Sequence, residues 1–125
     1  APSIEDSGID ILFGIGGAPE GVIAAVALKC LGGEIQGRLK FRNEEEKARA
    51  KKMGINDLDK KLTMNDMVRS NEAMFAATGV TDGTILRGVQ FLSHGAKTHS
   101  IVMRAKTKTV RFVEARHSFE HFPDY

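Results

Sequence analysis

The sequence contains no tryptophan, one tyrosine and one cysteine among its 125 residues. The shortage of tryptophan and tyrosine argues against a surface that stacks nucleic-acid bases. The net charge is only +2, and basic and acidic residues are interleaved, so no electrostatic footprint for nucleic acid is present. Cys30 cannot form an internal disulfide. We therefore expect it to be a small buried hydrophobic residue in a protein of the reducing cytoplasm.

The sequence also lacks a long apolar run. The longest, Val22 to Leu31, is too short to span a membrane and contains Lys29, so we expect neither a membrane partner nor a signal peptide. The length suits one domain with a buried core. The chain starts at Ala1 and not at methionine, which suggests a piece of a longer protein.

Glycine, by contrast, is plentiful between residues 14 and 21, where the sequence reads Gly-Ile-Gly-Gly-Ala-Pro-Glu-Gly. An apolar run over 9–13 predicts a strand before this segment, and the run over 20–31 predicts a buried helix after it, with Pro19 near its first position. Such a turn lets backbone N–H groups approach an anion at a helix N-terminus. Glu20 would repel a bare phosphate, but it would hold a metal ion that carries one.

Two nucleotide-binding motifs do not fit this segment. A dinucleotide fingerprint needs a third glycine where Pro19 stands, and Glu34, at the right distance for a ribose contact, begins the next predicted strand. A P-loop needs a Gly-Lys-Ser/Thr sequence that is absent. A tight turn without a ligand stays open as an alternative, although the composition of 16–21 exceeds what a turn requires.

The remaining pattern predicts an α/β protein with a mixed sheet and helices concentrated in the first half. Gly32 and Gly33 end the first helix, and a parallel β-α-β unit is expected with the strand over 34–40. Asn43 caps a polar helix over 44–53 that contains the Glu45–Arg49 pair. Further elements are a short helix over 58–68 and strands over 73–78, 88–92, 98–104 and 109–116, of which the last two form an antiparallel hairpin.

The four histidines give no clear site. His117 and His121 have a spacing that would suit a transition metal on a helix, but no third ligand is nearby. His94 and His99 flank a Gly-Ala-Lys segment, and His99 is expected to be a hydrogen-bonded polar residue that could also meet a phosphate. No Ser-His-Asp triad can be drawn from the spacing, and we assign no role to any of the four.

Four segments together resemble one family. They are Ile-Asp-Ile-Leu-Phe-Gly-Ile-Gly-Gly-Ala-Pro-Glu-Gly over 9–21, Leu-Lys-Cys-Leu-Gly-Gly-Glu-Ile-Gln-Gly-Arg-Leu over 28–39, Phe-Ala-Ala-Thr-Gly-Val-Thr-Asp-Gly over 75–83 and Thr-His-Ser-Ile-Val-Met-Arg over 98–104. In order and spacing they resemble the C-terminal part of class II (GlpX-type) fructose-1,6-bisphosphatases. The resemblance extends to about His117.

The resemblance implies a fold like the C-terminal domain of the lithium-sensitive sugar and inositol phosphatase superfamily. It implies hydrolysis of the 1-phosphate of fructose 1,6-bisphosphate with Mg²⁺ or Mn²⁺, in gluconeogenesis and glycerol metabolism. Some members also act on sedoheptulose 1,7-bisphosphate. On this resemblance Glu20 corresponds to a metal ligand and Gly17 to a glycine that contacts the substrate, and no further catalytic residue can be transferred.

Residues 1–125 are then expected to be the C-terminal domain of a larger sugar bisphosphatase whose N-terminal half supplies most metal ligands. The isolated chain should be inactive, because one carboxylate cannot hold a two-metal site. As it stands, the chain could be a non-catalytic sugar-phosphate-binding or assembly module. We expect a homo-oligomer, and an exposed apolar surface where the N-terminal half would pack.

Two positions depart from the family pattern. Lys97 stands where a threonine is usual, and Thr107-Lys108 stands in the hairpin where Ser-Gly would be expected. Without the glycine a positive φ is harder to reach, so we expect a different type of turn and unchanged chemistry.

Overall fold

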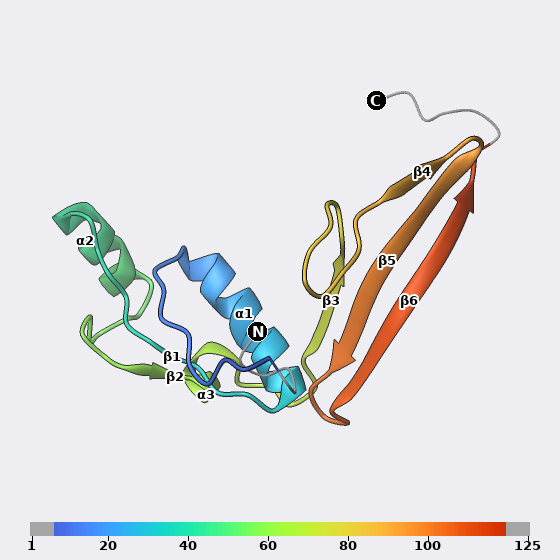
Figure 1. Ribbon diagram of the computed structural model, residues 1–125. Helices are drawn as coiled ribbons and strands as arrows, with labels where there is room; N and C mark the ends of the chain where they lie inside the picture. Colours follow the sequence, from blue (N-terminus) through green and yellow to red (C-terminus); the bar gives the residue numbers. More distant parts are fainter. Residues whose placement is uncertain (1–6, 120–125) are drawn as a thin grey trace.

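The computed structural model describes residues 7–119. These residues contain three helices that all precede four consecutive strands, and this mixture confirms the α/β class (Figure 1). In chain order they are α1 (Ala18–Leu31), β1 (Gln36–Gly37), α2 (Glu44–Lys52), β2 (Leu62–Thr63), α3 (Met64–Met67), β3 (Met74–Thr78), β4 (Gln90–Leu92), β5 (Gly95–Arg104) and β6 (Thr109–Ser118). No helix of the described part is long and apolar enough to cross a membrane.

The main sheet is built around β5. β3 and β4 pair with β5 along one edge and β6 pairs with it along the other, and all these pairings are antiparallel. The predicted hairpin is confirmed, with a continuous register that pairs Gly95 with Ser118 at one end and Arg104 with Thr109 at the other. Figure 1 shows this hairpin as the long outer part of the sheet.

Helix α1 ends at Leu31 as predicted and begins at Ala18, two residues before the predicted start. Pro19 lies in its first turn, and Gly32 ends it in the left-handed conformation with φ of 78°. One side of α1 packs on β3 and β5, where Cys30 and the buried residues Ile101 and Met103 form the core. The prediction of a helix buried all round is wrong, because Val22 and Ile23 are 44% and 57% exposed. Nothing in the described chain covers that side.

The predicted strand over 9–13 does not form. These residues have no regular secondary structure, and Phe13 is 85% exposed. A strand needs a neighbour for its backbone hydrogen bonds, and the described chain supplies none at this place. The parallel β-α-β unit is therefore absent from residues 7–119, in which every strand pairing is antiparallel. The predicted strand over 34–40 is reduced to β1, which pairs antiparallel with β2.

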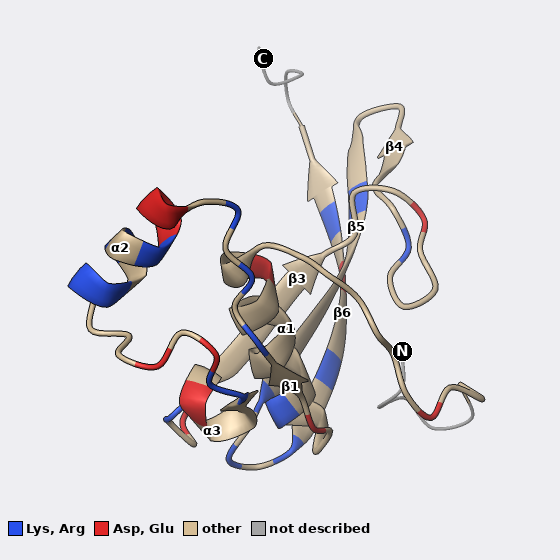
Figure 2. Ribbon diagram, turned by 90° about the vertical axis from the view of Figure 1, so that its left-hand side faces the viewer, with Lys and Arg blue, Asp and Glu red and all other residues tan. Residues whose placement is uncertain are grey.

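Helix α2 is confirmed. The Asn43 side chain accepts a hydrogen bond from the Glu46 N–H at 2.9 Å, and Arg49 lies 3.6 Å from Glu45. Acidic residues fill the first turn and basic residues the last, as Figure 2 shows, which complements the helix dipole.

The helix predicted over 58–68 is limited to the four residues of α3. Its start is fixed by Asp66, which accepts hydrogen bonds from Lys60 at 2.7 Å and from the Thr63 N–H at 2.8 Å. These contacts, led by the one with Lys60, hold the pKa of the Asp66 carboxyl well below its usual range. The two residues before α3, Leu62 and Thr63, form strand β2 and are not helical.

The turn between β5 and β6 differs from expectation. Lys108 has φ of 53°, and it is the only described non-glycine residue with a positive φ. We expected Lys108 to avoid a positive φ because it is not glycine, but it adopts one. Its Nζ donates a 2.5 Å hydrogen bond to the Lys29 carbonyl in the last turn of α1. This bond to a helix C-terminus offsets the backbone strain.

Candidate functional site

The predicted site lies at the N-terminus of α1. Gly17 is the N-cap residue, with extended backbone angles (φ −67°, ψ 154°), and no side chain caps the helix there. The Gly17 carbonyl accepts the Gly21 N–H at 3.0 Å, which closes the first turn. Residues 10–20 are all exposed. The helix start is therefore open to a ligand or to another part of a larger protein.

Glu20 and Gly17 lie against each other at this helix start. A methyl group on Gly17 would overlap the Glu20 Oε2 and lie 3.1 Å from its Cδ. At Gly14 and Gly16 the same methyl group would meet nothing within 4 Å. Gly17 is thus the one glycine of the 14–17 segment whose missing side chain leaves room for the Glu20 carboxylate.

The chemistry available here is that of one exposed carboxylate beside an open backbone. A carboxylate oxygen is a ligand that Mg²⁺ or Mn²⁺ accepts, so Glu20 fits one position of such an ion. Within residues 7–119, no three His, Cys, Asp or Glu side chains are close enough to hold a metal together. An ion at Glu20 would therefore need water or ligands from outside the described residues to complete its coordination.

The opposite end of α1 contains a polar cluster that the sequence did not reveal. Lys29, only 8% exposed, donates a 2.6 Å hydrogen bond to the Val68 carbonyl and a 3.4 Å bond to the Asn65 side chain. A cavity of about 250 Å³ lies beside Lys29, lined also by Glu34 and Lys108. The only sequence signal was a lysine inside an apolar run. Both lysines bind carbonyls at helix ends, which indicates a structural role.

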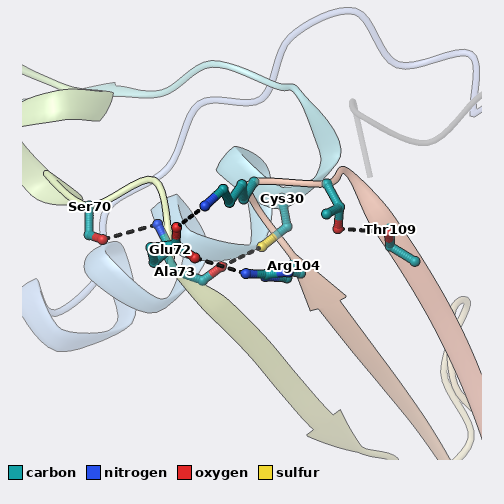
Figure 3. A network of polar contacts seen from close by, with 8 residues as sticks. Cys30, Ser70, Glu72, Ala73, Arg104 and Thr109 are labelled. Atoms are coloured by element: carbon teal, nitrogen blue, oxygen red, sulfur yellow. Dashed lines mark hydrogen bonds and ion pairs between the residues drawn. The ribbon is translucent and has the colours of Figure 1, made fainter.

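Cys30 is fully buried, as predicted. Its Sγ lies 3.9 Å from the Ala73 carbonyl, and burial raises the pKa of its thiol (Figure 3). In the same view Glu72 accepts a hydrogen bond from Arg104 at 2.9 Å. Glu72 also accepts a hydrogen bond from Lys106 at 2.5 Å. These ion pairs, led by the one with Lys106, lower the pKa of Glu72. They tie the start of β3 to the β5–β6 turn.

The histidines do not assemble a site. His99 accepts the Arg87 N–H at its Nδ1 over 3.0 Å and stacks on Phe112, which confirms the prediction of a hydrogen-bonded polar residue. His117 lies on β6 and contacts Thr98 at 3.0 Å. His117 thus lies on a strand and not on the helix that a metal pair with His121 would need, and His121 lies outside the described residues. His94 is exposed in the turn between β4 and β5.

Comparison with known proteins identifies the family to which the chain is similar. Residues 1–117 match the family described as bacterial fructose-1,6-bisphosphatase, glpX-encoded. The chain is 43% identical over 123 residues to a D-fructose 1,6-bisphosphatase class 2/sedoheptulose 1,7-bisphosphatase of Synechococcus sp. (strain JA-3-3Ab). It is also 43% identical over 124 residues to the protein named D-fructose 1,6-bisphosphatase class 2/sedoheptulose 1,7-bisphosphatase 2 of Acaryochloris marina (strain MBIC 11017).

These matches cover 89% and 90% of this chain but only 35% and 36% of the two relatives. The chain therefore spans about a third of the length of the curated relatives that it matches. The description of this family and the names of the relatives define a class of sugar bisphosphatases. More particularly, the chain belongs to the family of bacterial, glpX-encoded fructose-1,6-bisphosphatases.

Proposed function

We propose that this chain is the C-terminal part of a metal-dependent phosphatase that hydrolyses the 1-phosphate of fructose 1,6-bisphosphate. Water enters as the second reactant, the bond between phosphorus and the ester oxygen breaks, and the products are fructose 6-phosphate and inorganic phosphate. Membership in the family and the names of the relatives support the reaction. The observation that carries the proposal at this chain is the Glu20 carboxylate held over Gly17 at the exposed start of α1.

In this proposal Glu20 contributes one oxygen ligand to Mg²⁺ or Mn²⁺. Such an ion polarises phosphoryl oxygens and lowers the pKa of a bound water. Gly17 has no side chain, so the substrate can lie close to the backbone at the helix start, where N–H groups favour a phosphate. The chain binds and orients, while the other metal ligands come from the remainder of the enzyme.

A second substrate is favoured by one specific observation. The names of the two relatives described above include sedoheptulose 1,7-bisphosphatase. Sedoheptulose 1,7-bisphosphate has one more carbon than fructose 1,6-bisphosphate and carries the same 1-phosphate. An open helix start that contacts only this end of the sugar suits both. We therefore propose a dual enzyme as the alternative.

The exposed apolar residues give the rest of the enzyme a surface to pack on. Ile11, Phe13 and Ile15 precede the site, and Val22 and Ile23 follow it on the same helix. A monomeric protein rarely leaves such a group uncovered. We propose that the N-terminal half covers these residues and so brings its own ligands to Glu20. The free, buried Cys30 is compatible with a reducing cytoplasm, where gluconeogenesis and glycerol metabolism take place.

The test compares the complete enzyme with residues 1–125 alone. Each is incubated with fructose 1,6-bisphosphate and Mn²⁺, and both phosphate and fructose 6-phosphate are measured; sedoheptulose 1,7-bisphosphate is the second substrate. We expect both products in equal amounts from the complete enzyme and none from the isolated chain. Phosphate release from the isolated chain would contradict the proposal that its site is incomplete. If the complete enzyme formed no fructose 6-phosphate, the proposed reaction would be wrong.

A further inference from the structure

Strand β6 leaves one full edge of the main sheet open. Within residues 7–119 it pairs only with β5, and its register runs without a bulge over its 10 residues. β6 contains no proline, which is one of the usual devices that protect an edge strand. Phe112 and Val113, on its opposite faces, are 57% and 43% exposed. Figure 1 shows this strand at the outside of the sheet.

The hydrogen bonds show which residues of β6 present their backbone outward. Beyond the end of β6, the Phe119 N–H donates to the His94 carbonyl at 3.0 Å. Because bonding alternates along an antiparallel pair, the odd-numbered residues of β6 point their N–H and C=O groups at β5. The even-numbered residues then point theirs away. Phe112, Glu114 and Arg116 therefore offer backbone donors and acceptors to a further strand.

The charges on this edge would be complementary to those on the same edge of a second copy. Glu114 pairs with Arg87 at 2.7 Å and Lys97 at 3.8 Å, whereas Arg116 makes no ion pair within the described chain. Two copies of β6 that meet antiparallel about a two-fold axis at Ala115 would place each Glu114 opposite the partner copy's arginine. Moving the two-fold axis by one residue, to 114 or to 116, shifts the register of the two strands by two residues. Glu114 would then face Glu114 of the second copy, or Arg116 would face its Arg116, and such like-charge pairs are unfavourable.

We propose that the partner of this edge is a second copy of the chain, joined β6 to β6 about Ala115. The ladder runs over 112–118 and contains about eight backbone hydrogen bonds, two for each outward-facing pair. On one face Glu114 and Arg116 form two reciprocal ion pairs. On the other face Val113 lies opposite His117 of the second copy. The result is one continuous sheet across the two-fold axis, an isologous contact.

The experiment introduces a cysteine on the proposed axis of the complete protein, with other accessible cysteines replaced by serine. Ala115 would face its own copy as a non-hydrogen-bonded pair, with Cα atoms about 4.5 Å apart. That separation lies within the disulfide range. Ala115→Cys should therefore give a covalent dimer on mild oxidation. Val113→Cys is the matched control, because its copy would lie about 13 Å away along the strand.

A charge exchange provides the second measurement, by light scattering on a sizing column. Arg116→Glu should convert dimers to monomers, and Glu114→Arg combined with Arg116→Glu should restore the dimer. Circular dichroism confirms that each variant is folded. The proposal is overturned by a monomeric wild-type protein, by cross-linking of Val113→Cys in place of Ala115→Cys, or by a dimer that Arg116→Glu leaves intact.

Discussion

Replacing Gly17 with alanine tests the geometry of the helix start without changing any charge. The Gly17 backbone is extended, so alanine can adopt its angles without strain. The new methyl group would, however, overlap the Glu20 Oε2, and the carboxylate would have to rotate away. Glycine is clearly better than alanine at an N-cap, so the unfolding free energy should fall by about 1 kcal/mol.

The effect on metal binding should be larger. Removing a contact that orients a metal ligand typically costs about 10–100-fold in metal affinity, which corresponds to about 1.4–2.7 kcal/mol. The assay is a Mn²⁺ titration of the complete enzyme by calorimetry, with thermal unfolding measured on the same samples. Gly16→Ala is the matched control, because a methyl group there meets nothing within 4 Å. Equal metal affinities for the two variants would refute the contact between Gly17 and Glu20 as the reason for this glycine.

Three further predictions concern stability, each measured by urea or thermal unfolding. Lys108→Ala should lower the unfolding free energy by about 1 kcal/mol more than Lys108→Gly. Both variants lose the hydrogen bond to α1, but only glycine adopts the positive φ without strain. Equal losses of unfolding free energy in the two variants would contradict backbone strain at Lys108. Lys29→Met should cost about 1–3 kcal/mol, because the Val68 carbonyl loses its donor; an unchanged midpoint would show that this carbonyl finds another donor. The pKa of Asp66 is lowered on folding, so its contribution is present above about pH 4 and lost as the pH falls below. Asp66→Asn should reduce the loss of stability that the protein shows below about pH 4. If the stability of this variant depended on pH as that of the wild type does, Asp66 would not be the cause of that loss.

Elements whose signals are local could be predicted from the sequence. Pro19 and the glycine pair after Leu31 delimit α1, Asn43 caps α2, and alternation defines the β5–β6 hairpin. Each depends on contacts within a few residues or between neighbours in the chain. For the same reason the contact between Glu20 and Gly17 is a local one, since they are three positions apart at the start of one helix.

Elements that depend on distant partners could not be predicted. The run over 9–13 has the composition of a buried strand, but a strand forms only beside a neighbour, and here none is described. Lys29 read as an interruption of an apolar helix, because its acceptor lies 39 residues away on Val68. Lys108 was not expected to have a positive φ, because its hydrogen bond to the Lys29 carbonyl joins residues 79 positions apart. In each case tertiary contact decided the outcome.

The central claim is that Glu20 holds the metal of a sugar bisphosphatase. The most direct measurement is phosphate release from fructose 1,6-bisphosphate by the complete enzyme carrying Glu20→Gln, with Glu34→Gln, an exposed carboxylate just beyond the other end of α1, as its control. A metal contributes several kcal/mol to such a transition state. We therefore predict a loss of about a hundredfold or more for Glu20→Gln, with unchanged thermal unfolding and a near wild-type control. Wild-type turnover in Glu20→Gln would contradict the account.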